Sequence, residues 1–173
     1  DRKAWNNKTA GPGSALYKST NAGKTWKRIG KGLPTGENAG RMGITIAASN
    51  PKVLYILCDH RGVGGEVYRS DDGGESWRKL KTGLPSSNMG KIGLAMSPQN
   101  ASVLYAAIEL DLKKGGFYKS ENKGASWEKK SDILSGGTGP HYYQEIYASP
   151  HQFDRVYFAN NYLKVTNDGG KTF

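Results

Sequence analysis

The chain has 173 residues and a formal net charge of +10, from 25 Lys+Arg against 15 Asp+Glu. A mean hydropathy of −0.67 without any long apolar run excludes a transmembrane helix, and a single cysteine excludes a disulfide framework and a Cys-rich zinc site. The positive charge favours a nucleic-acid or anionic partner only if it is concentrated on one face.

Along the chain, an eight-residue motif occurs four times without gaps. The shared pattern is Ser/Thr-x-Asp/Asn-x-Gly-x-Thr/Ser-Trp/Phe, and its final aromatics fall at 26, 77, 127 and 173, which gives spacings of 51, 50 and 46 residues. The copies, called boxes below, are Ser19–Trp26, Ser70–Trp77, Ser120–Trp127 and Thr166–Phe173. Four copies in register indicate an internal repeat.

Further elements recur between the boxes. A strand–turn–strand pattern is found at 47–55, 97–105 and 149–157, and Lys31-Gly-Leu-Pro34 returns as Thr82-Gly-Leu-Pro85, less clearly near Ile133-Leu134. The unit at 86–136 contains four predicted strands: Ile92–Met96, Val103–Ile108, Gly116–Ser120 and Ser126–Lys130. No stretch has a helical period. Four short strands in about 50 residues predict an all-β fold and are typical of a β-propeller blade.

The box residues are predicted to be structural. Asp or Asn can accept hydrogen bonds from backbone N–H groups two residues on, Gly supplies a positive φ, Ser/Thr closes the turn, and the aromatic is expected to be buried beneath it. The EF-hand spacing of calcium ligands is absent. The residues assigned to this role are Ser19, Asn21, Gly23, Trp26, Ser70, Asp72, Gly74, Trp77, Ser120, Asn122, Gly124, Trp127, Asp168, Gly170 and Phe173.

These motifs resemble the Asp-box, or BNR, repeats of one group of β-propellers, which includes sialidases, sortilin-type receptors and family 74 glycoside hydrolases. The regular unit and the Pro-containing turn before Val-x-Tyr look most like the sortilin-type and family 74 branch. The resemblance covers nearly the whole chain and implies four-stranded antiparallel blades joined by Asp-box hairpins. It does not imply an activity, because this fold carries unrelated functions.

The repeat boundaries predict about three and a half blades, whereas a closed propeller needs at least about four. The predicted divisions are a partial blade at 1–35, complete blades at 36–85 and 86–136, and a partial blade at 137–173. Our hypothesis is a fragment of a longer chain with about seven to ten blades, completed by the remaining blades. The alternative is a half-propeller that closes with a second copy.

The clearest departure from the repeat is Gly139–Ile146, where Glu145 replaces Gly43 and Gly93 at the start of an innermost strand. One interpretation is a binding platform, in which tyrosines stack on a sugar ring or peptide and Glu145 accepts hydrogen bonds. In the alternative, Glu145 pairs with Arg41 or Lys91 and the tyrosines line the channel wall. The candidate ligand-binding residues are His141, Tyr142, Tyr143, Glu145, Arg41, His60 and Arg61.

Asp59 and Glu109 occupy equivalent positions, four residues after a strand tyrosine. Two such carboxylates could be the acid and base of a glycosidase, but repeated rim positions are more often solvated or paired with Arg and Lys. Cys58 ends an apolar run and is predicted to be a small buried hydrophobe. The histidines lack zinc spacing, so neither a metal nor a cofactor is predicted.

Lys and Arg flank the boxes on predicted outer strands, so we interpret the charge as a solvated rim without nucleic-acid binding. The favoured function is a non-catalytic recognition or scaffold segment that binds a glycan or another protein. The alternatives are part of a glycoside hydrolase acting on polysaccharide and a basic adhesion module. The resemblance also implies an extracytoplasmic location without membrane insertion.

Overall fold

The computed structural model describes residues 2–3, 6–7, 10–86, 89–110, 114–134, 145–159 and 162–173. The chain divides into two compact units, Asp1–Ile46 with Asn50–Lys79, and Ala47–Ser49 with Leu80–Phe173. Within the described residues the only helix is the single 3₁₀ turn η1, Gly36–Asn38, and none has the length and apolarity that a membrane crossing needs. The described chain is therefore built of strands and turns.

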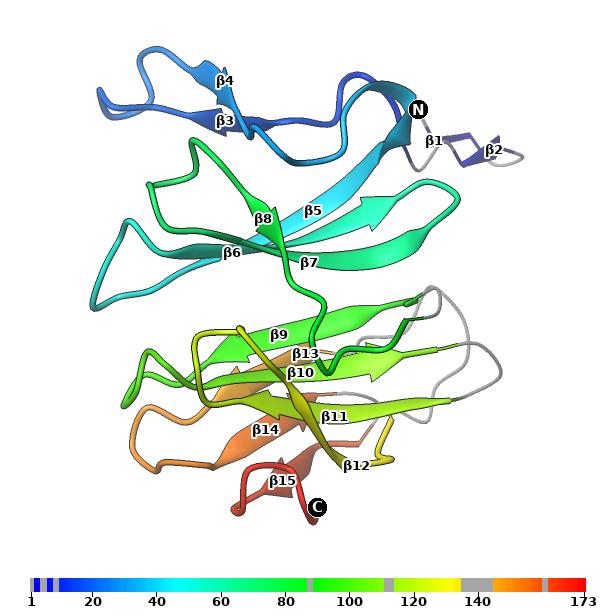
Figure 1. The fold of residues 1–173 in the computed structure, drawn as a ribbon, viewed down its shortest axis with the longest axis vertical. Helices are drawn as coiled ribbons and strands as arrows, with labels where there is room; N and C mark the ends of the chain where they lie inside the picture. The colour runs from blue at the N-terminus through cyan, green and yellow to red at the C-terminus, as the bar shows by residue number, and fades with distance from the viewer. Residues whose placement is uncertain are drawn as a thin grey trace. The chain divides into compact units, whose positions relative to one another are not determined.

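The first unit contains one four-stranded sheet and two two-stranded sheets (Figure 1). The larger sheet has the order β5-β6-β7-β8 and is antiparallel throughout. Its strands are β5 (Ala39–Ile46), β6 (Leu54–His60), β7 (Gly64–Ser70) and β8 (Arg78–Lys79). The small sheets pair β1 (Arg2–Lys3) with β2 (Asn6–Asn7), and β3 (Leu16–Lys18) with β4 (Lys27–Ile29).

The second unit contains two antiparallel sheets, β9-β10-β11-β12 and β13-β14-β15. The first is made of β9 (Ile92–Met96), β10 (Leu104–Glu109), β11 (Gly115–Ser120) and β12 (Glu128–Ser131). The second is made of β13 (Glu145–Ala148), β14 (Val156–Ala159) and β15 (Lys164–Thr166). In both four-stranded sheets each strand pairs with its neighbours in sequence, as expected for consecutive hairpins.

Strand composition follows position in the sheet. Leu104–Ile108 of β10 is a continuous apolar run with at most 1% exposure, because this central strand is covered on both faces. The edge strand β8 consists of Arg78 and Lys79, both exposed, and these charges discourage pairing with another chain. The predicted strands of the 86–136 unit agree with β9–β12 to within two residues at either end.

Each unit has its own apolar core. In the first unit, Leu16 of β3 packs against a cluster formed by Leu33, Leu54, Ile56, Cys58, Tyr68 and Trp77. In the second unit, Tyr105 and Phe117 of the β9–β12 sheet pack against Val156 and Phe158 of the β13–β15 sheet. Phe173 completes this core with its ring centroid 5.3 Å from that of Phe117. Burial of each such side chain contributes about 2 kcal/mol of hydrophobic free energy.

Candidate functional site

The box turns are held by hydrogen bonds from side chain to backbone. In the second box, Ser70 Oγ accepts the Gly74 N–H at 2.9 Å and donates to Asp72 Oδ1 at 2.7 Å. The Asp72 carboxylate accepts the Ser76 N–H at 3.0 Å and the Ser76 hydroxyl. The hydrogen bond from the Ser76 N–H to Asp72 thus spans four residues rather than the predicted two. The reason is that the loop first passes through Gly73 and Gly74, both in the left-handed conformation.

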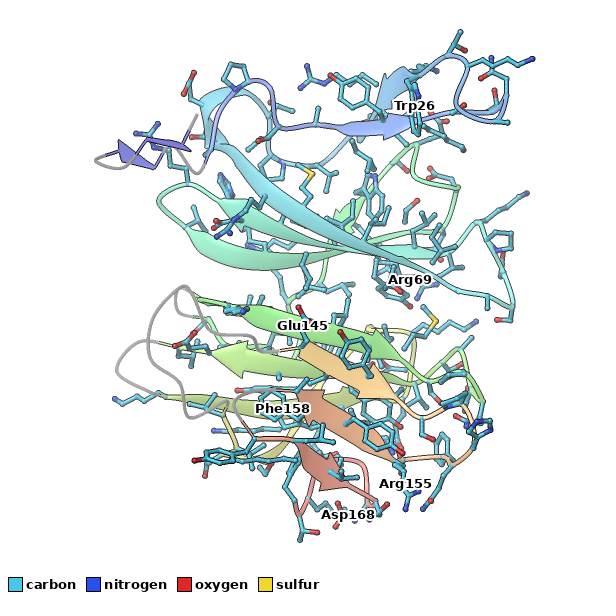
Figure 2. All side chains as sticks on the ribbon, turned by 180° about the vertical axis from the view of Figure 1, so that it is seen from behind. Trp26, Arg69, Glu145, Arg155, Phe158 and Asp168 are labelled. Atoms are coloured by element: carbon cyan, nitrogen blue, oxygen red, sulfur yellow. The ribbon has the colours of Figure 1, made fainter. Side chains whose placement is uncertain are left out.

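The Asp boxes hold their carboxylates in the ionised form. The hydroxyl and N–H of Ser76, together with the Ser70 hydroxyl, hold the pKa of Asp72 well below its ordinary range. The N–H and hydroxyl of Thr172, with the Thr166 hydroxyl, do the same to the pKa of Asp168. Asp168 lies in the turn after β15 (Figure 2). These carboxylates are occupied by the turn itself.

The Asn boxes have the same turn, but the hydrogen bond between the two side chains runs in the opposite direction, from the amide to the hydroxyl. Asn122 Oδ1 accepts the Ser126 N–H at 2.8 Å, while its Nδ2 donates to Ser126 Oγ at 2.7 Å. Asn21 makes the same pair of bonds with Thr25, at 2.9 and 2.8 Å. The amide therefore replaces the carboxylate without loss of either contact.

The box aromatics are not all buried. Trp77 and Trp127 are 7% and 5% exposed, as predicted, and Phe173 packs in the second core. Trp26 is 62% exposed, so the prediction of a buried aromatic is wrong for the first box. Trp77 belongs to a core cluster that contains Leu33 and against which Leu16 packs, and both leucines precede its sheet in the chain.

Glu145, at the start of β13, is exposed and accepts a hydrogen bond of 2.5 Å from the hydroxyl of Tyr147 (Figure 2). Side chains two apart on a strand share a face, so the pair forms one exposed carboxylate–phenol patch. The bond to Glu145 and the negative charge of its carboxylate raise the pKa of Tyr147. The other predicted platform residues, His141, Tyr142 and Tyr143, lie outside the described residues.

The remaining ligand-binding candidates gather at one end of the β5–β6–β7 sheet. His60 pairs with Gly64 across the tight turn from β6 to β7, and Arg61, in that turn, forms an exposed ion pair of 3.8 Å with Glu37. Arg41 lies on β5, at the irregularity between Ala39 and Met42, and is exposed. The ligand-binding role of these three residues stays a prediction.

Asp59 and Glu109 occupy equivalent ends of β6 and β10. Asp59 pairs with Gly65 and Glu109 with Gly115, and both side chains are half-buried. Glu109 also exchanges backbone bonds with the segment before β9, accepting the Gly90 N–H at 2.8 Å. The two carboxylates belong to different units, so their catalytic pairing stays a prediction.

Sequence reasoning missed a buried carboxylate. Glu66 on β7 is 3% exposed and accepts bonds from Tyr68 at 2.5 Å, from the Lys79 ammonium, and lies 3.0 Å from His60 Nδ1. Burial raises the pKa of Glu66, but the bonds from Lys79, Tyr68 and His60 outweigh burial and lower it. The signal was available in the repeat, since Glu66 replaces the glycine found as Gly116 in the next unit.

Two basic residues next to boxes are buried, which corrects the solvated-rim interpretation for them. Arg69 is 9% exposed and donates to Asp71 at 2.9 Å (Figure 2). Lys119 is 7% exposed and forms ion pairs with Asp154 and Glu121. Among the described residues no group of three or more His, Cys, Asp or Glu side chains could hold a metal ion.

The comparisons agree with this geometry. Residues 68–79, which include the second box, match the BNR/Asp-box repeat family model. No curated protein matches the sequence significantly. The predicted resemblance to Asp-box repeats is therefore confirmed by the family model, while the sortilin-type likeness stays a prediction.

Several solved structures share the fold. An ancestral GH74 enzyme has a TM-score of 0.67 and 21% identity, over 94% of this chain and 21% of that one. The GH74 xyloglucanase from Xanthomonas campestris has a TM-score of 0.68 and 20% identity, over 92% and 25%. The K499G mutant of NanB sialidase from Streptococcus pneumoniae has a TM-score of 0.57 and 17% identity, over 87% and 25%.

These likenesses confirm the predicted fold class: the chain is a segment of β-propeller architecture with antiparallel sheets. It spans about a quarter of the length of the solved structures it matches. The predicted blade boundaries stay a prediction.

Proposed function

We propose that this chain is a non-catalytic recognition and scaffold segment of an extracytoplasmic Asp-box propeller protein, and that its ligand is a glycan. The observation that carries the proposal is the exposed Glu145–Tyr147 pair at the start of β13. The proposed extracytoplasmic location of the protein rests on the likeness to Asp-box propellers alone. We propose a glycan as its binding partner and propose no binding of nucleic acid.

The chemistry of the pair fits a sugar. Tyr147 is 55% exposed and offers a ring on which the C–H face of a pyranose can stack. The Glu145 carboxylate is exposed and can accept charge-assisted hydrogen bonds from sugar hydroxyls. The short bond between the two side chains fixes the carboxylate relative to the ring, which reduces the entropy lost on binding.

The non-catalytic part of the proposal rests on how the carboxylates are used. Asp72 and Asp168 are occupied by their own turns, and the buried Glu66 is in contact with Tyr68, Lys79 and His60. Asp59 and Glu109 lie at equivalent strand ends, where each pairs with a glycine of the next strand. Because carboxylates at repeated positions are more often structural than catalytic, we favour binding over turnover.

Calorimetric titration with xyloglucan oligosaccharides and with a sialylated trisaccharide tests the binding. We expect saturable binding of one of these probes, weakened about tenfold or more by Tyr147→Ala and by Glu145→Gln. Tyr162→Ala is the matched control, because Tyr162 is 78% exposed in the same unit but lies outside the pair. Unchanged binding by both pair variants, or binding of neither probe, would contradict the proposal.

The second candidate is a contribution to a glycoside hydrolase, favoured by the GH74 enzymes among the similar structures. In that case xyloglucan would be cleaved, with release of reducing ends that is lost on Asp59→Ala or Glu109→Ala. We expect no release with the unsubstituted chain. Retained turnover that depends on either carboxylate would replace the first proposal with the second.

A further inference from the structure

The turn between β9 and β10 contains an Asn-x-Ser sequence, Asn100-Ala-Ser102 (Figure 1). This is the acceptor pattern of N-linked glycosylation, in which any residue except proline stands between the asparagine and the hydroxyl residue. Asn100 is exposed, and Ala101 and Ser102 are half-buried. Because so short a pattern also occurs by chance, its significance depends on the geometry of the turn.

The turn holds Asn100 in an Asx turn. The Ser102 N–H donates to Asn100 Oδ1 at 2.9 Å, and the Val103 N–H donates to the Asn100 carbonyl oxygen, also at 2.9 Å. The Asn100 Nδ2 atom makes no hydrogen bond to another described residue. Glycosylation takes place at this nitrogen, so the turn fixes the amide oxygen and leaves the reacting atom available.

The turn between β5 and β6 has the same geometry without the acceptor pattern. There the Lys52 N–H donates to Asn50 Oδ1 at 3.1 Å. Pro51 and Lys52 occupy the positions of Ala101 and Ser102. The Asx turn therefore explains the asparagine in both turns but not the hydroxyl of the second turn, since a lysine at that position forms the same backbone bond. Only the β9–β10 turn combines this geometry with the residues that a glycosyl transferase recognises.

The surroundings of the turn leave room for a glycan. Leu104 pairs with the last residue of β9 beside the turn, whereas Glu109 lies at the far end of β10. The Lys123 N–H, from the exposed loop of the third box, donates to the Ser102 carbonyl oxygen at 2.8 Å. A glycan on Asn100 would therefore lie beside this loop and would leave the Glu109 end of the sheet open.

We propose that Asn100 is an acceptor site for N-linked glycosylation, with an oligosaccharide linked to a lipid through pyrophosphate as the donor. Asn100 Nδ2 forms a bond to the anomeric carbon of the sugar, and the bond from that carbon to the phosphate oxygen breaks. The lipid pyrophosphate leaves with the electron pair of that bond, and one Nδ2 proton passes to a base of the transferase. The inference rests on the extracytoplasmic location in the proposed function, because this pattern is an acceptor in secreted proteins.

Reaction of the purified, folded chain with a single-subunit oligosaccharyltransferase and a lipid-pyrophosphate-linked disaccharide tests the proposal. Peptide mapping by mass spectrometry should find the disaccharide on Asn100 and none on Asn50. The mapping also separates Asn100 from the other acceptor pattern in the sequence, Asn7-Lys-Thr9. Ser102→Ala should abolish the modification of Asn100, whereas Ser102→Thr should retain it, because threonine restores the hydroxyl of the pattern.

The β5–β6 turn supplies a matched gain-of-function control. The double variant Pro51→Ala, Lys52→Ser introduces the acceptor pattern at a turn that already has the required hydrogen bond. We expect Asn50 to become modified in this variant. A synthetic peptide of residues 97–105, with a standard acceptor peptide beside it to show that the transferase is active, reports recognition of the sequence without the fold.

Three outcomes would overturn the proposal. They are modification of the peptide but not of Asn100 in the folded chain, modification of Asn100 that survives Ser102→Ala, and no modification of the peptide while the standard acceptor reacts. The reaction involves neither Glu145 nor Tyr147, so its failure would leave the proposed glycan binding standing. Loss of glycan binding in the titrations would likewise leave the acceptor site standing.

Discussion

Lys119 Nζ lies 2.9 Å from the Asp154 carboxylate and is 7% exposed, so a buried ammonium joins β11 to the turn before β14. Tyr105 donates its hydroxyl to the same carboxylate at 2.7 Å, and the Asp154 carbonyl accepts the Gly169 N–H at 3.0 Å. Burial lowers the pKa of Lys119, but Glu121 and Asp154 outweigh burial and raise it, so Lys119 stays charged.

Asp154→Asn should lower the free energy of unfolding by about 2 kcal/mol, since it leaves the buried ammonium with the exposed Glu121 as its remaining anion. Asp154 has a φ of +61°, which Asn also tolerates, so backbone strain does not contribute. Urea unfolding measures the loss. The matched control is Asp132→Asn, because Asp132 is 92% exposed in its ion pair with Lys129, and we expect a change of about 0.5 kcal/mol or less. Equal losses in the two variants would contradict the structural assignment.

Gly170→Ala should destabilise the chain more than Gly23→Ala. Both glycines have a positive φ, +97° and +84°, so both substitutions carry a backbone cost of about 1 kcal/mol. At Gly170 a Cβ would also lie 2.1 Å from the Phe117 ring, which adds about 1–3 kcal/mol of overpacking. At Gly23 the nearest atom is Trp26 at 3.8 Å. Thermal unfolding of the two variants gives the comparison, and a Gly23→Ala loss as large as that of Gly170→Ala would show that the ring contact is not the cause.

The turn chemistry could be predicted from the sequence because it is local and repeated. Ser70, Asp72 and Gly74 lie within five residues of one another, and four copies with the same spacing exclude a chance match. Strand positions followed from the same repeat. The prediction of where the box oxygen finds its N–H partner was wrong by two residues, since the local pattern does not specify the path of the two left-handed glycines.

Contacts between repeats could not be predicted. Lys119 and Asp154 are 35 residues apart, and nothing in the residues around either one indicates that they form a buried ion pair. Trp26 and Trp77 are equivalent in sequence but 62% and 7% exposed, because burial depends on the neighbouring segment rather than on the box. For Glu66 the sequence shows only a departure from the repeat. Its burial could not be predicted, because its three contacts come from different strands, β6, β7 and β8.

Asp72→Asn should reduce the pH dependence of stability in acid. The folded-state pKa of Asp72 lies below its unfolded value of about 3.9, so its contribution is fully present above about pH 4 and is lost as the pH falls through the folded value. The Asn variant keeps an acceptor for the Ser76 N–H, as Asn122 does for Ser126, but does not titrate. Melting temperatures from pH 7 to pH 2 should therefore show a gap between the two proteins that narrows below pH 4. Asn122→Asp should do the opposite and steepen the acid dependence; a gap independent of pH in both variants would contradict this account.

Cys58 should react with thiol reagents at least about 100-fold more slowly in the folded chain than in the unfolded chain at pH 8. It is 1% exposed, and burial, followed by the charges of Glu66 and Asp59, raises the pKa of its thiol to about 11. The thiolate is the reactive form, so both its small population and its lack of access slow the reaction. Ellman's reagent, with the same chain in guanidinium chloride as the control, measures the ratio. Fast labelling of the folded chain would contradict a purely structural role for Cys58.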